Sequence, residues 1–151
     1  MAQLTGLGGA YEAGNSEDRT TTAKAQLGAL AYDKLGNEYR YVKAGAAIAA
    51  GDAVRFQGSA LGFDDVRPTS ATLQTVVGVA LTAFASGEFG FVLRRGIGSV
   101  KTTGSVAANI GLASSGTAGT LATTAATDTA DLAATVLVSA ASPQVCYIQG
   151  I

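Results

Sequence analysis

The chain has 151 residues, a formal net charge of −1 and only 14% charged residues. That length fits one domain with a substantial core, and the near-neutral charge gives no electrostatic reason to expect binding to nucleic acid or to an anionic membrane. The sequence has no histidine and one cysteine, so it lacks the commonest general base and cannot form an intrachain disulfide. We therefore expect no enzyme, no catalytic residues, no cofactor and no metal site.

The first region, residues 1–24, is rich in glycine and has no regular apolar period. It reads either as a frayed terminus or as an extended N-terminal arm that becomes ordered on a neighbouring subunit, with Leu4, Leu7 and Tyr11 as its anchors. The predicted organisation is therefore an arm over residues 1–24 and a β-rich domain over residues 25–151. The first residues lack a secretory signal pattern, so synthesis in a cytoplasm is expected.

Two alternating runs joined by a short loop predict a β-hairpin over residues 26–41, with Gly36 at the left-handed position of the loop. Tyr39 and Tyr41, with neighbouring cations, could form a stacking face for single-stranded nucleic acid. The sequence favours a plainer interpretation, in which they lie on the outward face of an amphipathic hairpin.

A short sequence pattern, which we call the phrase, recurs at residues 49–54 and 85–92, and more weakly at 103–106. It consists of a small residue, a glycine and a polar residue, followed by a strand. Glycine allows the sharp turn, and the apolar or alternating run that follows is typical of a strand. The repetition predicts an all-β protein, either a small β-barrel or a β-sandwich. The glycine-rich segments 6–9 and 96–98 lack the strand-then-helix context of a phosphate-binding loop.

Further strands are expected along the middle of the chain. Residues 62–66 suit a short edge strand closed by a proline, and residues 75–81 are apolar on both faces, as in a strand buried on both sides. Residues 89–93 give an aromatic stripe that faces the core. It ends at Arg94 and Arg95, one of which should point inward to a partner and the other to solvent.

Residues 101–131 are rich in Ser, Thr, Ala and Gly, and predict short strands and long loops with Ile110, Leu112 and Leu121 as sparse anchors. Two closing strands are expected at residues 134–140 and 144–148. In the second of them, Cys146 is expected to be a buried, small apolar residue.

The adjacent carboxylates Asp64 and Asp65 point to opposite faces if they lie on a strand, so they cannot form an acid–base pair. A solvated edge or loop suits them better. Asp128 and Asp131 are too few for a calcium site, which needs six or more oxygen ligands.

The order of these phrases resembles small structural proteins of tailed bacteriophages. The resemblance spans about residues 30–103 and is carried by residues 30–33, 37–44, 48–54, 77–80 and 85–92. Such phrases accompany capsid decoration (cement) proteins and related head components. The family implies a β-rich, usually trimeric domain on the exterior of the capsid, bound to the major capsid protein, and often an arm that crosses capsomer boundaries. It carries no catalytic motif.

The leading expectation is thus a non-enzymatic virion protein that decorates and stabilises a phage capsid as a homotrimer, with the major capsid protein as partner and no binding to nucleic acid or membrane. Other virion roles remain open: tail tube, head-fibre base or adaptor. So does a carbohydrate-binding attachment module, in which Tyr39 and Tyr41 would have to serve as exposed aromatic platforms because the sequence has no tryptophan.

Overall fold

The computed structural model describes residues 5–6, 16–57, 62–71, 74–123, 134–137 and 141–150; the predicted arm anchors Leu4, Leu7 and Tyr11 lie outside them. Within these residues the structure has strands and turns but no α-helix. The strands are β1 (Thr5–Gly6), β2 (Arg19–Thr20), β3 (Leu30–Tyr32), β4 (Glu38–Lys43), β5 (Ala53–Phe56), β6 (Val66–Pro68), β7 (Gly78–Val79), β8 (Phe89–Val100), β9 (Gly111–Ser114), β10 (Leu121–Thr123), β11 (Ala134–Val136) and β12 (Gln144–Gln149).

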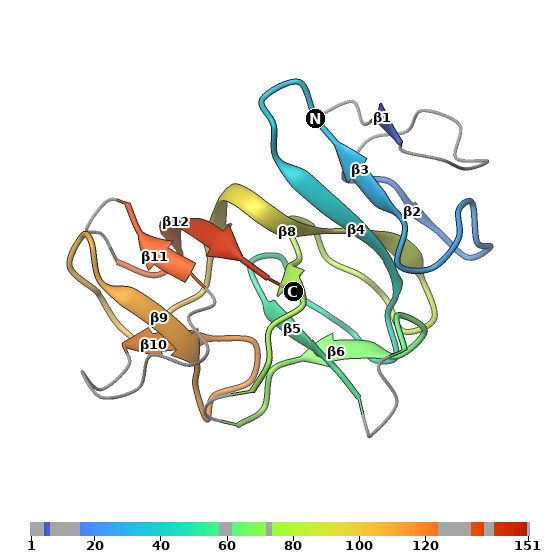
Figure 1. Cartoon of the computed structure of the whole chain (residues 1–151). Coiled ribbons are helices and arrows are strands. Elements are labelled where there is room, and N and C mark those ends of the chain that lie inside the picture. The colour runs from blue at the N-terminus through green and yellow to red at the C-terminus, as the bar shows by residue number, and fades with distance from the viewer. Residues whose placement is uncertain are drawn as a thin grey trace.

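The strands form one curled antiparallel sheet in the order β1-β3-β4-β8-β12-β11-β9-β10, and β5, β6 and β7 form a branch that joins β8 through β7 (Figure 1). The prediction of an all-β fold is confirmed. The sheet closes only into a half-barrel.

Strand β8 is the central strand that joins the two parts of the sheet. Its first half pairs with β4 and its second half with β12, so the early and late parts of the chain lie on either side of one strand (Figure 1). The pairing with β4 is irregular at Glu38 and Tyr39, opposite Arg95 and Leu93. An extra residue at such a bulge increases the local twist. Gly96, at a φ of +132°, follows at once, and the sheet curls there.

Both faces of the sheet are buried around Val42 of β4 and Val92 of β8. On the inner face, Tyr39, Tyr41, Phe91 and Leu93 belong to a core that continues to Leu112 and Ile148; on the other face, Val42 and Val92 pack in a second core. The predicted aromatic stripe on β8 is confirmed at Phe91. The expected position of Tyr39 and Tyr41 on an outward face is wrong, because both are at most 3% exposed. The alternation with Arg40 did indicate two unlike faces, but the tyrosines lie on the one that packs against Phe91 and Leu93 in the core.

The β3–β4 hairpin is confirmed, with Gly36 at a φ of +83°. Asp33 organises its loop: one carboxylate oxygen accepts hydrogen bonds from the backbone N–H of Leu35 and Asn37, and the other from the Asn37 amide and the Tyr39 hydroxyl. Burial alone would raise the pKa of Asp33. The hydrogen bonds, led by those from Asn37, outweigh it and hold this pKa below its ordinary value.

Tyr39 provides a pH-dependent prediction. Burial, and then the Asp33 charge, raise the pKa of its hydroxyl from 10.0 to about 12. Because the folded pKa lies above the unfolded one, this group's contribution to stability is complete below pH 10 and is lost as the pH rises through 12. Phenolate absorbance should show one late-titrating tyrosine that is missing in Tyr39→Phe. That variant should also lose less stability than the native protein over this alkaline range; an equal loss would contradict the assignment.

The recurring phrase forms two equivalent turns. In each, the residue after the glycine donates its N–H to the carbonyl three residues back: Asp52 to Ala49 at 3.1 Å and Glu88 to Ala85 at 3.2 Å. Gly51 and Gly87 have φ values of +83° and +88°, which a type II turn requires at its third position. The acidic side chain closes each turn by accepting the N–H of Ala49 or of Ala85.

The two turns make equivalent backbone hydrogen bonds, and their flanking residues pair with each other. Ile48 and Phe84 exchange reciprocal backbone hydrogen bonds of 3.0 and 2.9 Å. Ala80 pairs with the backbone of Gly51 and Asp52, as Ala44 pairs with that of Gly87 and Glu88. The repeated phrase is therefore a repeated structural unit, and its two copies are joined by backbone hydrogen bonds.

The third copy lies later than the sequence suggested. Residues 103–106 do not repeat the pairing, although Gly104 has a φ of +80°. Instead, Asn109 and Ile110 pair with the backbone of Val136 as Gly51 and Asp52 pair with Ala80. Asn109 has a φ of +65° and takes the place of the glycine. Asparagine tolerates this conformation, so the signal was present in the sequence but was missed.

Three other expectations change. The strand near residues 62–66 forms at β6 and includes Pro68; β6 pairs with β5, and Val66 also bridges Ala44. In residues 75–81 only β7 is a strand, although the residues from Val76 to Ala80 are buried as expected. Leu112 and Leu121 are fully buried anchors, whereas Ile110 is 40% exposed.

Parts of the predicted arm pair with strands of the same chain. Thr5 and Gly6 lie beside Tyr32 and Ala31 of β3, and β2 lies beside the start of β8. The Arg19 guanidinium stacks on the Phe84 ring at 3.8 Å and donates to the backbone carbonyl of Thr82. The boundary at residue 24 stays a prediction.

Candidate interaction surface

The outer face of β12 is exposed and partly apolar. Val145, Tyr147 and Gln149 point outward and alternate with the buried Gln144, Cys146 and Ile148. Both alternating sets contain apolar residues, a pattern typical of a strand that is covered on both faces. The apolar residues in both sets are visible in the sequence, which predicts only a closing strand here.

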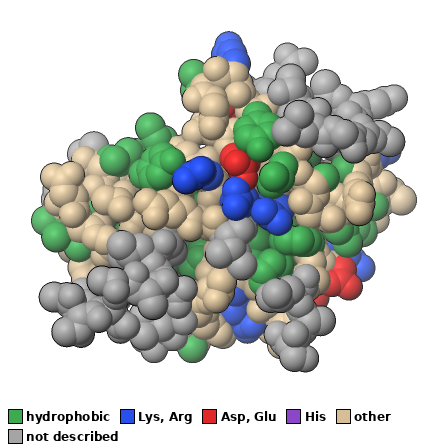
Figure 2. All heavy atoms as spheres, in the orientation of Figure 1, with side chains coloured by type: hydrophobic (Ala, Val, Ile, Leu, Met, Phe, Trp, Pro, Cys, Tyr) green, Lys and Arg blue, Asp and Glu red, His purple; other side chains and the backbone are tan. Residues whose placement is uncertain are grey.

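The neighbouring strands continue the same face. Ile97 on β8 lies directly opposite Tyr147, and Leu137, next to β11, donates its N–H to the carbonyl of Val145 at 3.0 Å. Ile97, Val145 and Leu137 are 58%, 43% and 41% exposed. We call Ile97, Tyr147, Val145 and Leu137 the apolar row. Figure 2 shows hydrophobic side chains gathered over β12 and the adjoining end of β8.

A group of arginines adjoins the apolar row at the bulge of β8. Arg94 donates to the carboxylate of Glu38, whereas Arg95 is exposed. One of the pair therefore binds a partner and the other is exposed to solvent, as expected, but Arg94 does not point inward, because Glu38 lies on the face of β4 opposite to the buried Tyr39. Arg40, on the same face of β4 as Glu38, lies beside Val92 and stacks on the Phe63 ring at 4.8 Å. We call Arg40, Arg94, Arg95 and Glu38 the arginine cluster.

The arginine cluster carries a net positive charge. Burial, and then repulsion from Arg94, lower the pKa of Arg40, and the Glu38 charge only partly offsets them. The Nε atoms of Arg40 and Arg94 are buried and have no hydrogen-bond partner among the described residues. Buried polar atoms are usually paired, so each such group calls for an explanation.

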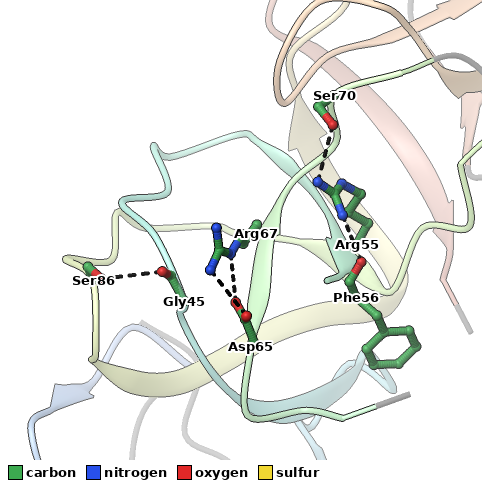
Figure 3. A network of polar contacts seen from close by, with 7 residues as sticks. All are labelled: Gly45, Arg55, Phe56, Asp65, Arg67, Ser70 and Ser86. Atoms are coloured by element: carbon green, nitrogen blue, oxygen red, sulfur yellow. Dashed lines mark hydrogen bonds and ion pairs between the residues drawn. The ribbon is translucent and has the colours of Figure 1, made fainter. Parts of the chain in front are cut away.

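A second polar group lies on the β5–β6 hairpin (Figure 3). Arg67 donates to both carboxylate oxygens of Asp65, at 2.7 and 3.2 Å, and Arg55 donates to Ser70 and to the carbonyl of Phe56. The Asp65 carboxylate occupies the space where a side chain at Gly45 would lie. Asp65 is thus a structural residue at the end of an edge strand, as expected of a solvated edge. Its half-exposed ion pair adds little to stability.

The reactive inventory of the described residues is small. Cys146 is fully buried, and burial raises the pKa of its thiol to about 11, so the nucleophilic thiolate is scarce at neutral pH. No group of three or more His, Cys, Asp or Glu side chains gathers to hold a metal in the part of the chain that the structure describes. The same part contains no helix long and apolar enough to cross a membrane.

Comparisons with known proteins give a match in structure but none in sequence. No protein-family model and no curated protein matches the chain. A solved structure does: the N base of the head fibre protein gp8.5 of bacteriophage phi29. The match has a TM-score of 0.55 at 13% identity and covers 73% of this chain and 90% of that one. The chain therefore shares the fold of a phage head fibre base.

Proposed function

We propose that this chain is a structural protein of a phage virion that attaches to the outer surface of the head, binds the major capsid protein and stabilises the shell as a decoration (cement) protein. The observation that carries the proposal is the fold it shares with a phage head fibre base. Residues 30–103, which resemble phage head proteins, include the β3–β4 hairpin, the paired turns and β8. The role needs no catalytic step and no cofactor.

The energetics of such a role follow from linkage. A protein that binds the assembled lattice more tightly than free capsid subunits shifts the equilibrium toward the shell. A symmetric oligomer, which we propose is a homotrimer, increases avidity without requiring one very strong site. Light scattering of the purified protein should give the mass of a trimer, and a monomer at every concentration would contradict that part of the proposal.

The test is cryo-electron microscopy of the virion of the phage that encodes this chain. The protein should appear as density on the exterior of the head, and heads made without it should break open at a lower temperature. Addition of purified protein should restore the lost stability. Absence of the chain from the head exterior would sink the proposal.

A head-fibre base is the second candidate, favoured by the identity of the matched structure. In this role the domain would anchor a fibre and would not stiffen the lattice. Heads without the protein would then lose their fibres but keep their thermal stability. That pair of outcomes separates the two roles.

The arm provides a further prediction. Deletion of residues 1–15 removes the proposed anchors Leu4, Leu7 and Tyr11 but keeps Arg19, which packs on Phe84. The truncated protein should therefore fold with a melting temperature within a few degrees of the native one, since only the two-residue strand β1 is lost from the described sheet. Its binding to heads should weaken, as measured by co-sedimentation. Equal binding would show that the arm does not contribute.

A further inference from the structure

We infer that the arginine cluster and the apolar row form one docking face, and that its occupant is a partner-protein segment that carries carboxylates beside apolar side chains. The inference rests on the proposed function, because it assigns the partner segment to the surface of the phage head. It adds the part of this chain that makes the contact and the chemistry that the head surface must present.

The two features are continuous along β8. The bulge opposite Glu38 and Tyr39 brings Arg94 and Arg95 to the outer side, and Ile97 follows two residues later on the same side as Arg95. Arg95 pairs with Gln149 and Ile97 with Tyr147, so the cation and the apolar row lie two positions apart on the same face of one ladder. Figure 2 shows the basic side chains beside the hydrophobic group on this face.

Charge complementarity selects an acidic occupant. The cluster holds three guanidinium groups and one carboxylate, on a chain whose formal net charge is −1. Glu38 is bound to Arg94, and no carboxylate of the described residues forms an ion pair with Arg95. Arg40 lies against the Phe63 ring and near a second cation, Arg94. A partner carboxylate would neutralise this excess, and arginine suits carboxylates because its planar donors can bind both oxygens.

The apolar row selects a protein over a nucleic acid. A phosphate backbone is bound through many spaced cations, and here one of three arginines is already neutralised. Three exposed aliphatic side chains beside the cations match the apolar centre and polar rim of a protein interface.

The experiment measures binding of the full-length purified protein to heads that lack it. Arg95→Glu and Ile97→Asp change exposed side chains, so both variants should fold. We expect each to bind at least about tenfold more weakly than the native protein. Matched controls lie at the tip of the β3–β4 hairpin: Lys34→Glu reverses an exposed charge and Leu35→Asp replaces a side chain that is 81% exposed. Both controls should bind like the native protein.

The outcomes separate the inference from the function on which it rests. If the native protein binds heads and both face variants bind equally well, the docking face is wrong and the proposed function stands. Equal loss in the hairpin controls also overturns the assignment to this face. If the native protein itself fails to bind, the proposed function and the docking face fail together.

A second measurement identifies the occupant. Arg95→Lys keeps the charge and introduces an amine that carbodiimide can couple to a contacting carboxylate. Mass spectrometry of treated particles should find this lysine joined to an Asp or Glu of a head protein. A cross-link to another copy of this chain would assign the face to self-assembly, and the absence of any cross-link in particles that bind the variant would also overturn the inference.

Discussion

Replacement of Phe91 by alanine should lower the free energy of unfolding by about 3–5 kcal/mol, the usual cost of removing a large buried aromatic ring. Phe91 is 1% exposed and lies opposite Tyr41 in the β4–β8 ladder. The two ring centroids are 5.1 Å apart at an angle of 59°, a tilted arrangement that adds to the burial of area. The cavity would open where the hairpin joins the strand that connects both parts of the sheet.

Chemical denaturation of the native and variant proteins measures this loss. Phe89→Ala is the matched control, because Phe89 stacks on the same Tyr41 at 6.4 Å but is only partly buried. Its cost should be clearly smaller, about 1–2 kcal/mol. If the two variants lose equal stability, the inner face of β8 is not the centre of the core.

Replacement of Asp52 by alanine should cost about 2–3 kcal/mol, because it removes a buried carboxylate with two kinds of partner. Asp52 closes its turn through the N–H of Ala49 at 2.8 Å and binds the Lys101 ammonium at 2.7 Å. Lys101 also donates its backbone N–H to the carbonyl of Gly51. Asp52 therefore links the first repeated turn to the end of β8. Lys101 is 37% exposed and can return to water, which keeps the cost below that of stranding a buried charge.

Glu88→Ala is the control supplied by the internal repeat. Glu88 occupies the equivalent position and makes the equivalent turn bond to Ala85 at 2.7 Å, but no described cation forms an ion pair with it. Its loss should cost at most about 1 kcal/mol. A similar loss of stability in both variants would mean that the hydrogen bond within the turn, and not the ion pair with Lys101, accounts for the contribution of Asp52 to stability.

Local features were predictable because short-range backbone geometry decides them. Gly36, Gly51 and Gly87 were expected at turns and all have positive φ, since a left-handed residue is an intrinsic requirement of the turn. The burial of Cys146, Phe91 and Leu93 followed from the strand pattern around them. The third turn was missed because Asn109 replaces the glycine, and the pairing with Val136 that reveals it connects distant residues.

The docking face could not be found from the sequence. Ile97 and Tyr147 are far apart in the chain and meet only through the register of β8 and β12. Arg94 and Arg95 share one side only because the ladder with β4 shifts at Glu38. The burial of Tyr39 and Tyr41 also depends on long-range pairing: they alternate with cations along β4, and their contact with Phe91 and Leu93 of β8 places them on the core side.

By itself, the sequence determined that this chain is an all-β protein and where the turns at Gly36, Gly51 and Gly87 lie. These properties depend on residue type and on spacing over a few positions. The tertiary structure alone decided that the sheet stops at a half-barrel, that two repeated turns hold each other, and that basic and apolar residues share one outer face. Each of these depends on strand register, and a shift of one residue turns every side chain to the opposite face.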